Sequence, residues 1–252
     1  MYNLINQQMN TIVSAFVSNV NNRYNNSLFR YYNYGKLLLQ SLVPKVIFVD
    51  ELMFNLIGNE YDKTNTLIIK INKKDTYLYK HAGKLSNFQL NSTDYTKDTP
   101  EFMFTMCNKT EWIKKAIGLN YFKTDNFIWV DFGIKHIFSN GCSNDSFIEK
   151  INNLKYKSYK NVRIGGIWDF NYNYNIDIYK DIAWYFAGGV FGGNKQSLIK
   201  FADLMKEKCV DIMNSKNTIM WEVNIWYLIY MKHKELFDIY KCDHNESLIT
   251  NY

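Results

Sequence analysis

The feature that most constrains how this chain can fold is a set of short apolar runs separated by helical stretches. Runs of four to seven residues, rich in β-branched and aromatic side chains, lie at residues 11–17, 46–49, 66–71 and 127–130. Such runs are typical of buried strands. Between them, residues 32–41 and 110–119 have helical character, the second with apolar side chains on one face. Strands that alternate with helices predict an α/β fold with a mostly parallel central sheet.

The second half of the chain has a different pattern but shows no sign of a separate domain. Residues 162–168 are strand-like with a glycine pair, and residues 184–193 place two more glycine pairs among aromatic side chains. Helices are expected over residues 197–214, with Asn194 as N-terminal cap, and over residues 220–230. The sequence contains no internal repeat and no Pro/Gly/Ser-rich linker, so we expect one continuous domain.

Composition excludes several classes of protein. Hydrophobic residues make up 47% and charged residues 21% of the 252 residues, which fits a packed core and excludes disorder as the main state. With 12 Gly and 2 Pro, collagen-like fibres are also excluded. The net charge of +6 is spread along the chain without a docking motif, so we expect no nucleic-acid partner.

Cysteine usage and hydropathy indicate the compartment. The cysteines are scattered and none has C-x-x-C spacing, which fits a reducing environment. The first ten residues lack the apolar core of a signal peptide, and no run of 18 apolar residues occurs. The sequence therefore predicts a cytoplasmic protein without a transmembrane segment.

The most informative polar residue is Asp131, which directly follows the apolar run Phe127-Ile-Trp-Val130. In open α/β sheets, ligands bind outside the carboxyl ends of the strands. A carboxylate at that place can bind a divalent cation together with phosphate oxygens. The alternative is a structural role, in which Asp131 caps the turn after the strand.

The glycine pairs Gly188-Gly189 and Gly192-Gly193 allow two interpretations. Glycine permits close approach of the backbone to a ligand, and the surrounding aromatic side chains suit the apolar face of a sugar. Alternatively, the pairs form tight turns next to core aromatics. The sequence G-x-x-x-x-G-K-[ST] of a phosphate-binding loop is not present.

Two further acidic positions are candidates. Glu222 lies in the apolar run Trp221-Glu-Val-Asn-Ile-Trp226, so its carboxylate must be paired, solvated by a cavity or functional, unless it serves the dipole of the following helix. Asp243 and His244 are adjacent near the C-terminus, where they could complete a metal site or bind a diphosphate.

Six motifs in order resemble the HtrL/YibB-like family of proposed glycosyltransferases, and the resemblance covers nearly the whole chain. They are Asn108-Lys109, Phe127-Ile-Trp-Val-Asp-Phe-Gly-Ile134, Val162-Arg-Ile-Gly-Gly-Ile-Trp168, Trp184-Tyr-Phe-Ala-Gly-Gly-Val-Phe-Gly-Gly193, Met220-Trp-Glu-Val-Asn-Ile-Trp-Tyr227 and Asp243-His-Asn245. That family is associated with the assembly of lipopolysaccharide or other surface glycans.

The segment 185–193, followed by a helix and Trp221-Glu222, is similar to the galactosyl and N-acetylgalactosaminyl transferases of the blood-group type. This similarity implies a single GT-A-like domain over residues 1–252. It would join a Rossmann-like nucleotide-binding half, residues 1–134, to a smaller donor-sugar and acceptor half, residues 135–252. In such enzymes a D-x-D motif binds Mn²⁺ and the diphosphate, but here Gly133 takes the place of the second acid.

The resemblance also implies roles for individual residues. Metal binding of Mn²⁺ or Mg²⁺ would fall to Asp131, with Asp243 or His244 in place of the missing acid. The nucleotide-sugar, with a UDP-sugar expected, would contact Ser14, Ala15, Phe16, Arg23, Asp50, Lys109, Trp129, Val130, Asp131, Phe132, Gly133, Gly188, Gly189 and Trp221. Glu222 would be the catalytic carboxylate. It would act as general base if the reaction inverts, or as nucleophile or oxocarbenium stabiliser if the reaction retains configuration.

Transfer of a sugar to a glycan acceptor is therefore the function that the sequence predicts. Two alternatives remain open. The missing second acid favours a catalytically inactive protein that binds a nucleotide-sugar or carbohydrate. A scaffold in glycan assembly would bind a partner protein and no nucleotide.

Overall fold

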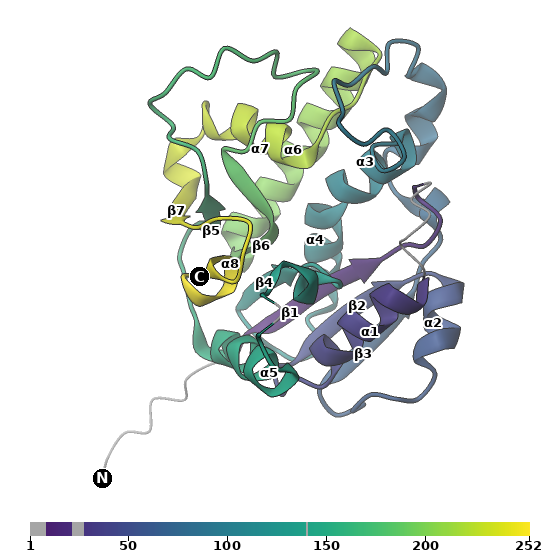
Figure 1. The fold of residues 1–252 in the computed structure, drawn as a ribbon, viewed down its shortest axis with the longest axis vertical. Coiled ribbons are helices and arrows are strands. Elements are labelled where there is room, and N and C mark those ends of the chain that lie inside the picture. Colours follow the sequence, from purple (N-terminus) through teal and green to yellow (C-terminus); the bar gives the residue numbers. More distant parts are fainter. Residues whose placement is uncertain (1–8, 22–27, 140) are drawn as a thin grey trace.

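A computed structural model describes residues 9–21, 28–139 and 141–252, and its centre is one seven-stranded sheet (Figure 1). The strands are β1 (Thr11–Phe16), β2 (Lys45–Val49), β3 (Thr66–Lys70), β4 (Asn126–Val130), β5 (Val162–Gly166), β6 (Phe186–Asn194) and β7 (Phe237–Lys241). They are ordered β3-β2-β1-β4-β6-β5-β7. Only β6 runs antiparallel to its neighbours among these strands. The expected α/β class with a mostly parallel sheet is confirmed.

The strands of the first half follow the apolar runs closely. All residues of β2 and β4 are buried, because helices cover both faces of the sheet. A strand that is buried on both faces is apolar throughout its length, and this makes it easy to find in a sequence. The predicted runs at 46–49 and 127–130 therefore differ from the observed strands by one residue at most.

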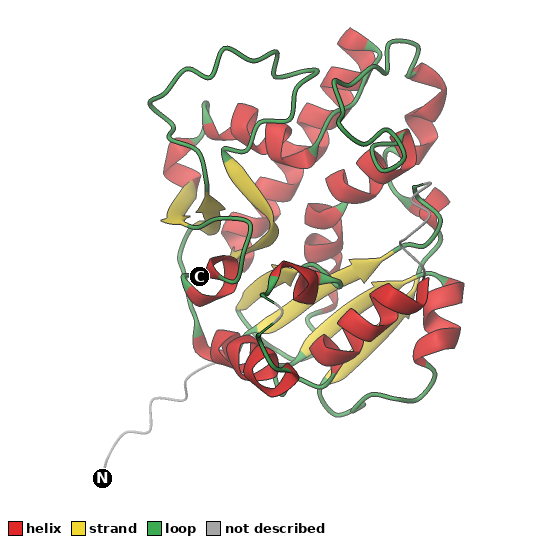
Figure 2. Cartoon of the chain, in the orientation of Figure 1, coloured by secondary structure: helices red, strands yellow, loops and turns green. Residues whose placement is uncertain are grey.

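Helices form a layer on each face of the sheet (Figure 2). One face is covered by α1 (Leu28–Leu39), α2 (Glu51–Ile57), α5 (Asn144–Asn152) and α8 (Ser247–Thr250). The other face is covered by α3 (Pro100–Cys107), α4 (Lys109–Leu119), α6 (Lys195–Lys216) and α7 (Glu222–Tyr230). Short 3-10 helices lie at Lys73–Asp75, Tyr79–Lys84, Ile134–Ile137, Asn153–Tyr156 and Lys234–Leu236.

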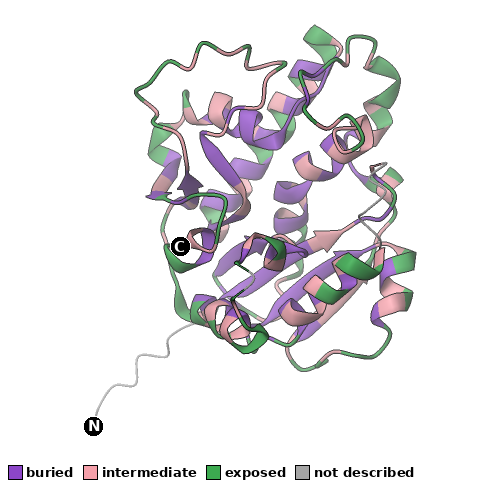
Figure 3. Ribbon diagram, viewed as in Figure 1, coloured by how far each residue is buried: buried purple, intermediate pink, exposed green. Residues whose placement is uncertain are grey.

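Each layer has its own hydrophobic core, and the strands supply alternate side chains to the two cores. In β4, Ile128 packs toward α1 and α5, whereas Phe127 and Trp129 pack toward α4 and α6. This is the two-residue period of a strand. Figure 3 shows the result, with buried strands between helices whose outer sides are exposed.

The glycine pairs differ from the expected tight turns. Gly188, Gly189, Gly192 and Gly193 all lie within strand β6. A Cβ atom on Gly192 would come within 2.5 Å of the main-chain oxygen of Phe127 in β4, so this pair lets two strands approach closely. The expected capping role of Asn194 is confirmed, because its side chain accepts the Ser197 N–H at 2.9 Å at the start of α6.

No helix in the described ranges is long and apolar enough to cross a membrane.

Candidate active site

A cavity of about 400 Å³ lies at the carboxyl ends of β1 and β4. Its wall combines residues of the parallel half, such as Phe16 and Asp131, with residues of the second half, such as Gly188, Glu222 and His244. The carboxyl edge of a parallel sheet, where strand β4 is followed by the antiparallel β6, is where α/β proteins bind ligands. The cavity is within the usual size range for small-molecule sites.

Lys109, the first residue of α4, lies at the centre of the polar wall. Its Nζ is 3.0 Å from Oδ1 and 3.3 Å from Oδ2 of Asp131, and it donates to Oε1 of Glu222 at 2.9 Å. It also donates to the main-chain oxygen of Gly188 at 3.0 Å. One ammonium therefore joins the end of β4, strand β6 and the start of α7.

The electrostatics of this group favour full ionisation of the lysine. Burial alone would lower the pKa of Lys109, but the charges of Asp131 and then Glu222 outweigh it and raise that pKa above its ordinary value. Only 2% of the Lys109 side chain and 8% of the Glu222 side chain are exposed, so these two charges interact largely away from water, whereas 31% of the Asp131 side chain is exposed.

Hydrogen bonds to neighbouring residues fix the orientation of Asp131. The indole Nε1 of Trp129 donates to Oδ1 at 2.6 Å, and the Asp131 N–H donates to the Gly189 oxygen at 2.9 Å. Trp129 is itself fixed by stacking on Trp112 and Phe191. With 31% of its side chain exposed, Asp131 is oriented by the core and still reaches the cavity.

Glu222 begins α7, where a carboxylate also benefits from the helix dipole. Its side chain is only 8% exposed and pairs with Lys109. A Cβ atom on Gly188 would lie 2.6 Å from Oε1 of Glu222. The absence of a side chain at Gly188 therefore leaves room for this carboxylate beside β6.

Aromatic side chains at the ends of β1 and β4 and in α1 also line the cavity. The ring of Phe16 lies 5.0 Å from that of Tyr31 and 5.9 Å from that of Phe132. Phe16, Tyr31 and Phe132 all line the cavity. These rings suit a flat, partly apolar group.

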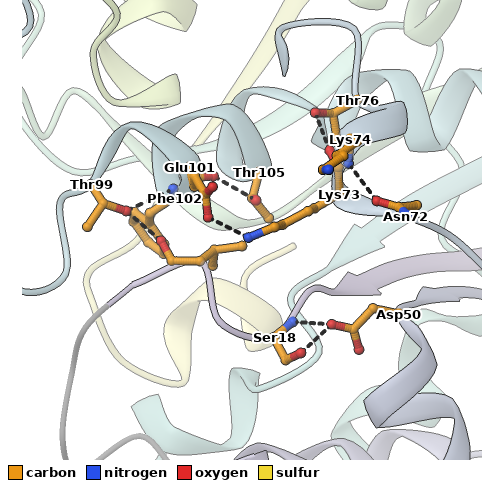
Figure 4. A network of polar contacts seen from close by, with 11 residues as sticks. Ser18, Asp50, Asn72, Lys73, Lys74, Thr76, Thr99, Glu101, Phe102 and Thr105 are labelled. Carbon is orange, nitrogen blue, oxygen red and sulfur yellow. Dashed lines mark hydrogen bonds and ion pairs between the residues drawn. The ribbon is translucent and has the colours of Figure 1, made fainter. Parts of the chain in front are cut away.

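The segment after β1 is tied to two neighbouring elements, as Figure 4 shows. Ser18 donates its N–H to Oδ2 of Asp50 at 2.7 Å and its hydroxyl to the same oxygen. Asp50 also caps α2 through the Met53 N–H. On the other side, the Thr99 hydroxyl donates to the Val20 oxygen at 2.5 Å.

The cavity brings together most of the residues that the sequence singled out. Those that line it are Ala15, Phe16, Lys109, Trp129, Asp131, Phe132, Gly133, Gly188, Gly189, Trp221, Glu222 and His244. Ser14, Val130, Asp50 and Asp243 do not line it. Ser14 and Val130 are fully buried in the sheet, and Asp50 anchors the segment after β1. Arg23 lies outside the described residues.

The expected metal ligands fit a divalent cation poorly. Asp131 and His244 share the cavity, but the exposed Asp243 does not line it, and its carboxylate accepts the His244 N–H at 2.7 Å. Both oxygens of Asp131 lie within 3.3 Å of the Lys109 ammonium, so the carboxylate that would bind a metal ion is already paired with a cation. Within the described part of the chain, no three acidic, histidine or cysteine side chains gather in a metal-binding group.

Sequence reasoning missed Lys97 and Trp184, which also line the cavity. Lys97 belongs to the irregular segment before α3, where no periodicity places a residue in space. Trp184 contacts His244 edge-on with ring centroids 4.2 Å apart. The sequence signal that could have identified Trp184 is its position in the aromatic and glycine-rich segment 184–193.

Comparison with solved structures shows an overlap with 4-diphosphocytidyl-2C-methyl-D-erythritol synthase from Anaerococcus prevotii. The TM-score is 0.45 with 9% sequence identity, over 98% of this chain and 92% of that one. An overlap of this extent carries no information about activity. No curated protein matches this chain at a significant level.

The sequence itself matches one family model, HtrL_YibB, described as a bacterial protein of unknown function. The match spans residues 9–248, which includes β1, the Lys109–Asp131–Glu222 group and His244. The chain therefore belongs to the HtrL_YibB family.

Proposed function

We propose that this protein is a glycosyltransferase that moves a sugar from a nucleotide-sugar, with a UDP-sugar as the expected donor, to a glycan acceptor. The observation that carries the proposal is the pair of carboxylates, Asp131 and Glu222, which line one cavity on either side of the Lys109 ammonium. They come from the two halves of the fold, so the cavity can contact both ends of an elongated donor.

The chemistry of the walls suggests how the donor lies. The rings of Phe16, Tyr31 and Phe132 suit a nucleobase, which has two flat faces. The polar group of Asp131, Gly188 and Glu222 suits the sugar, whose hydroxyls donate to carboxylates. The diphosphate then lies between them.

Glu222 is the proposed catalytic residue, because it is the carboxylate of the second half that faces the cavity. If the reaction inverts, it accepts the proton of the acceptor hydroxyl as general base. If the reaction retains configuration, it stabilises positive charge at the anomeric carbon or attacks that carbon as a nucleophile. In both cases Lys109 fixes its orientation.

Mn²⁺ or Mg²⁺ was the expected cofactor for this reaction class. The expected ligands Asp131, Asp243 and His244 do not surround a common position in the cavity, so the proposed reaction uses no divalent cation.

A catalytically inactive nucleotide-sugar-binding protein is the second candidate. It is favoured by Gly133, which stands where an acid would complete the D-x-D motif, and by the deep burial of Glu222. Such a protein would bind the donor in the same cavity without releasing nucleotide from it.

A thermal-shift screen against UDP-, GDP-, CDP- and ADP-sugars tests the proposal. A ligand that binds only the folded state stabilises it by about 2.7 kcal/mol at a concentration of one hundred times its Kd. We expect one nucleotide class to raise the Tm, and the donor of that class to release free nucleotide slowly on incubation. A protein that no nucleotide-sugar stabilises would contradict the proposal, and stabilisation without any nucleotide release would favour the inactive binding protein.

A further inference from the structure

The cavity contains positive groups that the proposed reaction has not yet used. Of the lysines that line it, Lys109 is committed to Asp131 and Glu222. Lys97 is different, because its Nζ lies 3.8 Å from Oδ1 of Asp98, which is too far for a hydrogen bond. Its Nζ also lies over the face of the Phe102 ring, at 5.4 Å from the centroid.

Asp98 is already engaged with other donors. Its Oδ2 accepts the Ser92 hydroxyl at 2.5 Å, and its Oδ1 accepts the indole N–H of Trp221 at 3.3 Å. Trp221 precedes the catalytic candidate Glu222 and lines the cavity. Asp98 therefore positions the wall of the cavity, while the ammonium of Lys97 keeps donors to offer to a ligand.

His244 lies at the cavity from the C-terminal segment. Its ring packs edge-on against Trp184, and the described residues provide no hydrogen-bond partner for either ring nitrogen. Lys97 and His244 both line this cavity, so one bound ligand can contact both. An imidazole ring donates at least one N–H whether it is neutral or protonated.

From these contacts we propose that Lys97 and His244 bind the diphosphate of the nucleotide donor and that the site needs no divalent cation. This inference rests on the proposed function. The Lys109 ammonium already occupies the cavity-facing carboxylate of Asp131, and Asp243 does not line the cavity. The fixed cation and the N–H donor thus perform the charge neutralisation that a metal ion performs in other sites.

The reaction requires Lys97 and His244 to stabilise the charge that develops on the leaving diphosphate. As the sugar leaves, the bond between its anomeric carbon and the β-phosphate oxygen breaks, and the electron pair stays on that oxygen. The anomeric carbon bonds to the acceptor oxygen, either directly or through a glycosyl-enzyme intermediate at Glu222. The acceptor proton passes to Glu222 in the direct reaction and to the leaving diphosphate oxygen when Glu222 is the nucleophile. Lys97 is a phosphate-binding residue in this scheme, because its ammonium neutralises the charge that develops on the leaving diphosphate.

Binding of UDP and of inorganic pyrophosphate, measured by calorimetry in buffers with EDTA or with MnCl₂, tests the proposal. Pyrophosphate reports on the diphosphate site whatever base the donor carries. We expect the Kd values in EDTA to lie within about 2-fold of those in MnCl₂. Lys97→Met should weaken both ligands roughly 10-fold or more, and Lys97→Arg should restore most of the loss.

Two further variants make the result specific. His244→Phe keeps the ring against Trp184 but removes both nitrogen atoms, so it should also weaken both ligands. Lys114→Met is the matched control, because Lys114 forms an exposed ion pair with Asp203 on the surface and should leave both Kd values unchanged.

UDP binding that disappears in EDTA and returns with MnCl₂ would overturn this inference and leave the proposed function intact. If Lys97→Met binds UDP and pyrophosphate with wild-type affinity and has an unchanged Tm, this inference is also overturned and the proposed function stays intact. Failure of the wild-type protein to bind any nucleotide-sugar in either buffer would instead contradict the proposed function itself.

Discussion

At the scale of single residues, Lys109 decides whether two carboxylates can lie side by side in a buried wall. Asp131 and Glu222 come from distant parts of the chain and share one ammonium. Removing one partner from a buried ionic group leaves an uncompensated charge, which costs far more than the net contribution of the intact group. This lysine therefore positions the site and also supports the fold.

Lys109→Met should lower the free energy of unfolding by about 3 kcal/mol or more at pH 7, because both carboxylates lose their cation. Urea denaturation measures this. Lys114→Met, which removes a surface ion pair, should cost less than about 1 kcal/mol. Equal losses in the two variants would contradict the central role of Lys109.

The sequence could identify Asp131 and Glu222 as candidate site residues, but it could not show that Lys109 pairs with both of them. Asp131 is visible because a fully apolar run ends at it, and Glu222 because it is an acid among apolar residues. Lys109 entered only through the resemblance, since a lysine before a helix is ordinary. Lys97 gave no signal at all, because its place depends on the path of an irregular segment and on packing against Phe102.

At the scale of elements, strand β6 connects the packing of the sheet to the geometry of the cavity. Gly192 allows close contact with β4, while Gly188 leaves space for Glu222. The sequence singled out these glycines and left open whether they form tight turns or let the backbone approach a ligand closely. The structure places them within a strand, which local pattern could not distinguish because glycine pairs usually mark turns, and a strand that needs close backbone approach has the same signature.

Gly188→Ala should displace the Glu222 carboxylate and reduce sugar transfer, because the new Cβ would lie 2.6 Å from Oε1. We expect UDP affinity to change much less than the rate of transfer. Gly118→Ala is a suitable control, since a Cβ there meets nothing within 4 Å and helix α4 gains roughly 0.5–1 kcal/mol. Wild-type transfer in Gly188→Ala would show that the close contact has no role in catalysis.

The segment after β1 offers a second test at this scale. Asp50→Ala removes both the cap of α2 and the anchor of Ser18, so it should cost about 1 kcal/mol or more and also weaken UDP binding. Ser143→Ala removes the comparable cap of α5, which does not line the cavity. It should reduce stability and leave UDP affinity unchanged. If both variants bind UDP alike, the anchor does not shape the site.

At the scale of the whole molecule, the parallel half of the sheet could be predicted well and the second half less so. Strands that are buried on both faces, such as β2 and β4, can be recognised in the sequence as apolar runs. The order of β6, β5 and β7 depends on contacts between residues far apart in the chain, which local pattern does not encode. The composition of the cavity wall has the same origin, because Lys97, Asp131 and His244 meet only in the folded molecule.

Lys45 is a buried lysine outside the Lys109–Asp131–Glu222 group, and its shifted pKa leads to a prediction of how the free energy of unfolding depends on pH. Burial lowers the pKa of Lys45 to about 7, while Nζ donates to the Ser41 oxygen at 2.8 Å. In the unfolded chain a lysine has a pKa of about 10.4, so between pH 7 and 10 the unfolded state binds more protons and stability rises with pH.

The difference in unfolding free energy between the wild type and Lys45→Met isolates this effect. It should move in favour of the wild type by roughly 1.4 kcal/mol per pH unit across that window. Urea denaturation at pH 7, 8.5 and 10 measures it. Parallel pH profiles for the two proteins would show that Lys45 remains charged in the fold.

The most direct test of the whole account is release of nucleotide from the donor that stabilises the protein, compared between the wild type and Glu222→Gln. The account predicts that the variant binds this donor with nearly wild-type affinity while its turnover falls by roughly 100-fold or more, because the carboxylate that acts at the reacting centre is gone. Full turnover by Glu222→Gln, or a wild-type protein that turns over no nucleotide-sugar, would contradict it.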